Sequence, residues 1–236
     1  MGSKPDADGE VSYREVGRLF GLVVHDVRNP VATISANVGF LSEGGLVFED
    51  EDAEEAFEDL RLAVQELQRG LEQIGWITRW LLGEPSVALG DGEPLEAARR
   101  AAERVEGLQV DLEAADDLQG ASVRRAGPGL VALLALLLRN SRQHAPDRRA
   151  RLRLKRSEDR LYIELFDTGP RIDEALGERV FTLPGQYAAK REASGGRYGR
   201  YLELLAARSV ADTLGARLEV GRGPEDPVFR VTLPLD

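Results

Sequence analysis

The sequence predicts an α+β fold class, in which a helical hairpin that forms a dimeric four-helix bundle is followed by an α/β sandwich with a mixed sheet. In the first third of the 236 residues, apolar side chains recur every three or four positions, which is the period of amphipathic helices. The rest of the chain alternates strand-like runs with strongly apolar helices, as expected for helices layered on a sheet. We therefore expect a hairpin domain in residues 1–83, a linker in 84–94 and an α/β domain in 95–236.

Two apolar stripes predict the two helices of the hairpin, and the stretch "SEGGLVFEDED" at 42–52 predicts the loop between them. The second stripe has heptad spacing, which is typical of helices in a bundle. A lone hairpin cannot cover both stripes, so a second copy of the chain is the expected partner, and a homodimer follows. The first stripe comprises Val16, Leu19, Phe20, Val23, Val27, Val31, Ile34, Val38 and Leu41, and the second comprises Phe57, Leu60, Val64, Leu67, Leu71 and Ile74.

The segment "GEPSVALGDGEP" is rich in glycine and proline, which predicts a linker. Beyond it, "GPGLVALLALLLRNSRQHAP" predicts a buried helix with a proline near its start and another beyond its end. The alternation on both sides of "SEDR" predicts a β-hairpin. The elements expected after the linker are helices in 95–105, 127–146 and 200–215, a strand in 108–114, a β-hairpin in 150–169 and a final strand pair in 216–234.

Composition excludes several classes of function. The chain has no cysteine, so disulfides, thiolate nucleophiles and cysteine-ligated zinc are excluded. A net charge of −10 argues against a general nucleic-acid or anionic-membrane surface. No run reaches the roughly 20 apolar residues that span a bilayer, and no signal peptide is visible. We therefore expect a soluble, cytoplasmic protein with no nucleic-acid partner and no membrane segment.

The stretch "HDVRNP" places an unusual set of residues inside the first predicted helix. His25 lies off the apolar stripe, and Asn29 follows one turn later on the same face. Pro30 cannot donate to the carbonyl of Asp26, at a cost of roughly 3 kcal/mol. A neutral imidazole is a nucleophile near pH 7, and a neighbouring carboxylate can orient it and take its proton. A surface histidine in a proline-kinked helix is the simpler alternative, and a metal site has less support because no second histidine or acid pair lies at ligand spacing.

These residues resemble the H-box of two-component sensor histidine kinases, whose pattern is His-(Glu/Asp)-x-x-Asn-Pro on the first helix of a dimeric four-helix bundle. All four defined positions are present in "HDVRNP". The resemblance implies that His25 takes the phosphoryl group from ATP and that Asp26 serves as base. It also implies that Asn29 helps a water molecule to remove phosphate from a bound response regulator receiver domain.

The second half of the chain resembles the ATP-binding domain of the same family. "LLLRNSRQHAP" is similar to the N-box, "DTGPRI" to the G1 box, "ERVF" to the phenylalanine-containing box, and "SGGRYGRYLELL" to the glycine-rich lid with the helix after it. The resemblance implies ATP and Mg²⁺ as cofactors. It places Asn140 as the Mg²⁺ ligand and Asp167 where a carboxylate recognises the adenine amino group. The nucleotide-binding residues implied are Asn140, His144, Asp167, Gly169, Gly196 and Gly199.

Several positions depart from the family pattern. Arg171 replaces the second glycine of the G1 box, and its side chain is expected to crowd a place where backbone approaches the nucleotide. Tyr201 and Glu203 replace the last two glycines of the lid, and an acid there would repel phosphate. Gln143 stands where a basic residue is usual, and Arg139 where an acid is common. The phosphoacceptor half therefore resembles the family more closely than the ATP half does.

Three functional hypotheses follow. The first is a histidine kinase that autophosphorylates His25 from ATP and passes the phosphoryl group to an aspartate of a response regulator. The second is a pseudokinase with a degenerate ATP site, whose histidine is loaded and unloaded by receiver domains. The third is a non-catalytic dimerisation scaffold, which does not need His25, Asp26 and Asn29 together.

Overall fold

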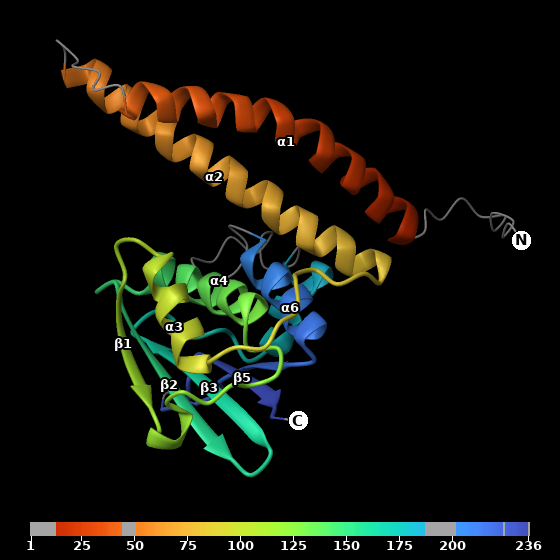
Figure 1. Ribbon diagram of the computed structural model, residues 1–236, viewed down its shortest axis with the longest axis vertical. Helices are drawn as coiled ribbons and strands as arrows, with labels where there is room; N and C mark the ends of the chain where they lie inside the picture. The colour runs from red at the N-terminus through yellow and green to blue at the C-terminus, as the bar shows by residue number, and fades with distance from the viewer. Residues whose placement is uncertain (1–12, 44–50, 187–201, 224, 236) are drawn as a thin grey trace, which may run out of the picture. The chain divides into compact units, whose positions relative to one another are not determined.

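The computed structural model describes residues 13–43, 51–186, 202–223 and 225–235. They belong to two compact units, Met1–Glu84 and Pro85–Asp236, each of which is described by itself. The first unit is helical and the second contains a five-stranded sheet with helices (Figure 1). In the part of the chain so described, no helix is long and apolar enough to cross a membrane.

The first unit is an antiparallel pair of long helices, α1 (Tyr13–Glu43) and α2 (Glu51–Leu82). Glycines allow the two helices to approach closely. A Cβ added to Gly17 would lie 3.3 Å from the Leu82 side chain, and one added to Gly21 would lie 3.5 Å from that of Thr78. Residue numbers that rise along α1 therefore meet numbers that fall along α2, as the hairpin prediction requires.

The face of α1 that packs on α2 differs in part from the predicted stripe. Val24, Val31 and Leu71 form a buried cluster against which Ile74 packs, yet Val24 was not in the predicted stripe. The stripe spans two neighbouring faces of the helix, and a 3.6-residue period alone does not separate them. Only one of these faces is covered within the hairpin. The predicted stripe residues that remain between 36% and 49% exposed are Phe20, Val23, Val27, Ile34, Leu41, Leu60 and Leu67.

The second unit contains a mixed sheet with strand order β1-β2-β3-β5-β4. β1 and β2 are parallel, and every other neighbouring pair is antiparallel, which confirms the predicted mixed sheet. The β2–β3 hairpin turns at the predicted "SEDR". The strands are β1 (Gln109–Ala114), β2 (Arg149–Ser157), β3 (Arg160–Asp167), β4 (Arg217–Val220) and β5 (Phe229–Pro234).

Three helices cover one face of this sheet (Figure 1): α3 (Pro94–Glu103), α4 (Pro128–His144) and α6 (Glu203–Leu214). α4 is buried almost all round because it packs against α3, α6 and the strands. α6 ends at Gly215, whose φ of 69° lies in the left-handed region where glycine carries no Cβ penalty. The predicted helices and strands are present here, with ends that differ by a few residues.

The segment predicted as a linker is attached to the second unit by hydrogen bonds. Ser86 is fully buried, its N–H donates to Thr213 Oγ1 at 3.0 Å, and its hydroxyl donates to the Ser209 carbonyl at 3.2 Å. Gly92 pairs with Val123 in a short antiparallel bridge. The predicted linker therefore runs along the α/β unit and is bonded to it at Ser86 and Gly92.

Candidate functional site

His25 lies on an exposed flank of α1. Its neighbour Val24 is only 5% exposed, because it faces α2. Adjacent helical residues are separated by about 100° around the axis, so the burial of Val24 turns the imidazole outward. His25 is therefore accessible to a reacting group that approaches the hairpin.

The helix backbone lacks one hydrogen-bond donor next to His25. α1 continues through Pro30, which has no N–H to donate to the Asp26 carbonyl. The hydroxyl of Thr33 donates to the Asn29 carbonyl at 3.1 Å, a contact that often bends helices. Asn29 is exposed, and the side chain of Asp26 lies outside the described atoms. The three proposed phosphotransfer residues thus lie on one helical turn, next to this missing donor.

A groove of about 380 Å³ runs between α1 and α2 on the flank that carries His25. It begins at Arg28, one turn beyond the histidine, and includes Ala32, which follows His25 by seven residues and shares its face. Arg79 and Trp76 line it from α2. The exposed apolar face lies on the other flank of α1, so the hairpin presents a polar groove beside the histidine and a separate apolar stripe.

In the α/β unit, the C-terminal ends of α4 and of the central strand β3 lie at the same end of the sheet. Asn140 is 2% exposed within α4, and His144 is its last residue. Asp167 ends β3, and its Oδ1 accepts a hydrogen bond from the Gly169 N–H at 2.9 Å. The Thr168 hydroxyl donates to Asp147 Oδ1 at 2.7 Å, which ties this turn to the loop after α4. The structure therefore brings together the N-box and G1-box segments.

The remaining predicted nucleotide residues, Gly196 and Gly199, lie outside the described residues, as does Tyr201. Glu203 is described. It is the first residue of α6 and is 8% exposed. A carboxylate at a helix N-terminus is favourable for the helix but takes the place where a phosphate would benefit from the same partial positive charge. If a phosphate binds at the start of α6, as the family resemblance implies, the charge of Glu203 opposes it.

The charge of Arg171 acts on the β4–β5 turn. Hydrogen bonds from the backbone N–H groups of Gly223 and Arg222 lower the pKa of Asp226 below its ordinary value. The positive charges of Arg230 and of Arg171 contribute to the same lowering of that pKa. The expectation that Arg171 crowds the nucleotide stays a prediction.

A second hollow, of about 390 Å³, lies between the segment after Arg171 and the end of β4. Three carboxylates line it, from Asp173, Glu174 and Glu178, with Arg222 opposite. Among the described residues, no group of three or more histidine or acidic side chains could hold a metal ion. The Asp167–Gly169 turn therefore presents the carboxylate that the family resemblance assigns to adenine.

Sequence reasoning missed Asp147 and the groove residues of the hairpin. The Thr168–Asp147 bond joins residues 21 positions apart, and no local pattern connects them. One weak signal in the sequence pointed to the groove. Trp76 lies outside the heptad stripe of α2, and large aromatic side chains are usually at least partly buried.

Asp147→Ala is expected to loosen the Asp167–Gly169 turn. The hydrogen bond from the Thr168 hydroxyl is the largest cause that lowers the pKa of Asp147. The bond is therefore fully formed at pH values above the ordinary pKa of an aspartate, and it is lost as the pH falls through the lowered pKa. Loss of one such bond should speed amide hydrogen exchange at Gly169 by about 2- to 10-fold at neutral pH. Asp147→Asn keeps an acceptor oxygen and is the matched control. Unchanged exchange in Asp147→Ala would contradict the role given to this bond.

Comparison with known proteins places these segments in a family. Residues 125–236 match the family described as histidine kinase-, DNA gyrase B-, and HSP90-like ATPase. The swarming motility regulation sensor protein RssA of Serratia marcescens is 28% identical over 229 residues, which cover 89% of this chain and 44% of RssA. The chain thus spans less than half the length of this curated relative.

Solved structures share the fold. Full-length ShkA in complex with AMPPNP aligns with a TM-score of 0.65 at 17% identity, over 95% of this chain and 46% of that chain. The histidine kinase AdeS of Acinetobacter baumannii aligns with a TM-score of 0.51 at 12% identity, over 90% of this chain and 98% of that chain. Residues 125–236 therefore form a domain of the histidine kinase-, DNA gyrase B- and HSP90-like ATPase family, and the chain as a whole is similar to the core of two-component sensor histidine kinases.

Proposed function

We propose that this chain is an ATP-dependent protein histidine kinase core that phosphorylates His25 and passes the phosphoryl group to an aspartate of a response regulator receiver domain. The observation that carries the proposal is the combination, in one chain, of an exposed histidine on a proline-containing helix with a domain of the ATPase family. In this assignment residues 1–83 provide dimerisation and phosphotransfer, 84–94 connect, and 95–236 bind ATP.

The proposed reaction is a nucleophilic displacement at phosphorus. An imidazole nitrogen of His25 forms the N–P bond while the bond from the γ-phosphorus to the ADP oxygen breaks, and Asp26 takes the imidazole proton. Asn29, which offers both a donor and an acceptor, orients the water that removes phosphate from a bound receiver. Asn140 would ligate Mg²⁺, and Asp167 would accept a hydrogen bond from the adenine amino group.

A pseudokinase is the second candidate, and the first turn of α6 favours it. Glu203 is nearly buried there, and a fixed negative charge opposes the approach of phosphate. In this case the same His25 is loaded and unloaded by phosphorylated receiver domains, and the α/β unit has a structural role. A scaffold without phosphotransfer has no observation in its favour.

Calorimetric titration of the chain with ATP and magnesium tests the kinase proposal. We expect weak binding, with a Kd near 1 mM or about −4 kcal/mol, because the adenine side fits and the phosphate side opposes. Asp167→Asn should weaken this binding beyond detection, because the neutral amide oxygen is a weaker acceptor toward the adenine amino group than the carboxylate. Asp173→Asn, which removes the same charge in the same segment, should not weaken it.

Glu203→Gln is expected to tighten ATP binding by about tenfold, since it removes the charge and keeps the size of the side chain. Glu174→Gln is the matched control and should leave the Kd within about twofold of wild type, because Glu174 is exposed to solvent. If neither wild type nor Glu203→Gln binds ATP, the kinase proposal fails and the pseudokinase remains. Transfer of label to His25 from a phosphorylated receiver would then demonstrate that role.

A further inference from the structure

The outer face of the sheet, opposite α3, α4 and α6, is rich in cations. Side chains alternate between the two faces of a strand. On β2, every second residue from Arg149 to Lys155 is basic and points away from the helices, while Leu152 and Leu154 point into the core. The charged residues at outward positions are the basic Arg149, Arg151, Arg153, Lys155, Arg160, Arg217 and Arg230 and the acidic Asp111, Glu113, Glu164 and Glu219.

This outer face has an excess of basic residues, whereas the chain as a whole has an excess of acidic ones. The whole chain carries −10, and residues 85–236 carry 24 basic and 24 acidic side chains. Seven basic residues against four acidic ones on the outer face therefore leave an acid excess on the rest of the unit. A sheet face that is merely solvated does not require this segregation.

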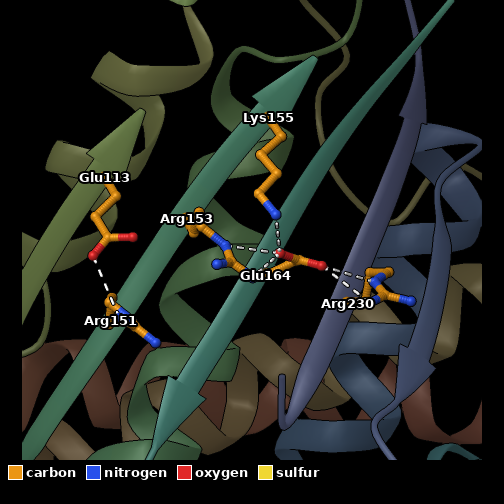
Figure 2. A network of polar contacts seen from close by, with 6 residues as sticks. All are labelled: Glu113, Arg151, Arg153, Lys155, Glu164 and Arg230. Atoms are coloured by element: carbon orange, nitrogen blue, oxygen red, sulfur yellow. Dashed lines mark hydrogen bonds and ion pairs between the residues drawn. The ribbon is translucent and has the colours of Figure 1, made fainter. Parts of the chain in front are cut away.

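Three of these basic side chains pair with one nearly buried carboxylate, that of Glu164. Glu164 is 7% exposed, and Arg153 donates to its Oε2 from Nε at 3.0 Å and from Nη2 at 2.7 Å. Arg230 donates to Oε1 at 3.2 and 3.0 Å, and Lys155 Nζ lies 3.3 Å from Oε2 (Figure 2). Burial raises the pKa of Glu164, but the bonds from Arg153 and Arg230 outweigh it and lower the pKa overall. One ionised carboxylate thus fixes three positive charges.

The ring of Phe166 also helps to order the basic side chains of β2. The guanidinium carbons of Arg151 and Arg153 lie 4.7 and 4.8 Å from the ring centroid of Phe166. Arg151 also reaches Glu113 on β1 at 3.5 Å (Figure 2). Side chains that are already ordered lose less conformational entropy when a partner binds them. The face is therefore prepared for association, although Arg151 and Lys155 remain 45% and 49% exposed.

We propose that this outer face of the sheet docks an acidic α-helix of a partner protein. Outward residues on a strand repeat about every 6.7 Å. Carboxylates four residues apart on a helix repeat about every 6 Å, which nearly matches the cations along β2. Asp111 and Glu113 flank these cations on β1 and would meet the continuous negative charge of a nucleic-acid backbone. A helix with spaced carboxylates avoids that repulsion.

Fluorescence anisotropy with the full chain tests this surface. The probe is a labelled synthetic helical peptide with glutamate at every fourth position. We expect saturable binding that weakens about tenfold between about 50 and 200 mM salt, because the contacts are between exposed charges. The double variant Arg149→Glu with Arg151→Glu should weaken it at least about tenfold at the lower salt concentration.

The matched control is Arg99→Glu with Arg104→Glu on the opposite, helical side, where Arg99 has the same 56% exposure as Arg149. It makes the same change of net charge and should bind the peptide like wild type. Lys155→Gln, which leaves both arginine pairs of Glu164 in place, is a milder variant that should also weaken binding if the double variant does not fold.

Four results would overturn the proposal: no peptide binding, equal loss in the control, tighter binding of a DNA oligonucleotide or of anionic vesicles, or salt-sensitive self-association that the Arg149 and Arg151 changes abolish. The last result would assign the face to a second copy of the chain. None of these measurements uses nucleotide or His25, so this proposal and the kinase proposal fail separately.

Discussion

His25→Ala is expected to abolish phosphate incorporation into the chain, whether the phosphoryl donor is ATP or a phosphorylated receiver domain. The imidazole is the nucleophile in the proposed reaction, and alanine has no atom that can form the N–P bond. The measurement is radiolabelling followed by acid and base treatment. The label on wild type should be lost in acid and retained in base, as expected for phosphohistidine and not for phosphoserine.

His144→Ala is the matched control, since His144 is the only other histidine and ends α4 in the α/β unit. When a phosphorylated receiver is the donor, this variant should be labelled like wild type. Asn29→Ala should also be labelled but should slow dephosphorylation of a partner receiver, because the water loses its orienting amide while the nucleophile remains. Label that persists in His25→Ala would rule out His25 as the phosphoacceptor.

Leu67→Asp is expected to convert a homodimer into a monomer. Leu67 is 49% exposed in the single hairpin and lies in the heptad stripe of α2 together with Leu60. If a second copy covers this stripe, the variant buries a carboxylate without a partner, at a cost of several kcal/mol. Sedimentation velocity at micromolar concentration should show a dimer for wild type and a monomer for the variant.

Leu62→Asp provides the control on the same helix. Leu62 is 44% exposed, which is close to the value for Leu67, but it lies about 140° away around α2 and outside the heptad stripe. This variant should remain a dimer. A monomeric wild type, or equal dissociation by both substitutions, would contradict the proposed interface.

The helices and strands were predictable because their signals are local. The period of apolar residues along α1 and α2, and the alternation on both sides of "SEDR", each depend on neighbours within a few positions. The capping glycine at 215 and the prolines around α4 are equally local. Consequently the fold class and the order of the elements followed from the residues alone.

The candidate site was predictable only where a motif is contiguous. "HDVRNP" and "DTG" name His25 and Asp167 without any knowledge of the fold. Asp147 was missed because its partner Thr168 is brought to it by the pairing of β2 with β3. The composition of 84–94 predicts a linker, but it does not reveal that Ser86 bonds to α6, more than 120 residues away.

The sequence by itself determined which residues are helical, which are in strands and where the histidine motif lies, because short-range periodicity and sterics decide these features. Only the tertiary structure decided that Val24 rather than Val27 faces α2, because Gly17 and Gly21 let the helices approach along that side. It also decided that Glu164 gathers Arg153 and Arg230, since strand pairing sets them on one face. Such contacts depend on which segments become neighbours in space, and that depends on the packing of the whole chain.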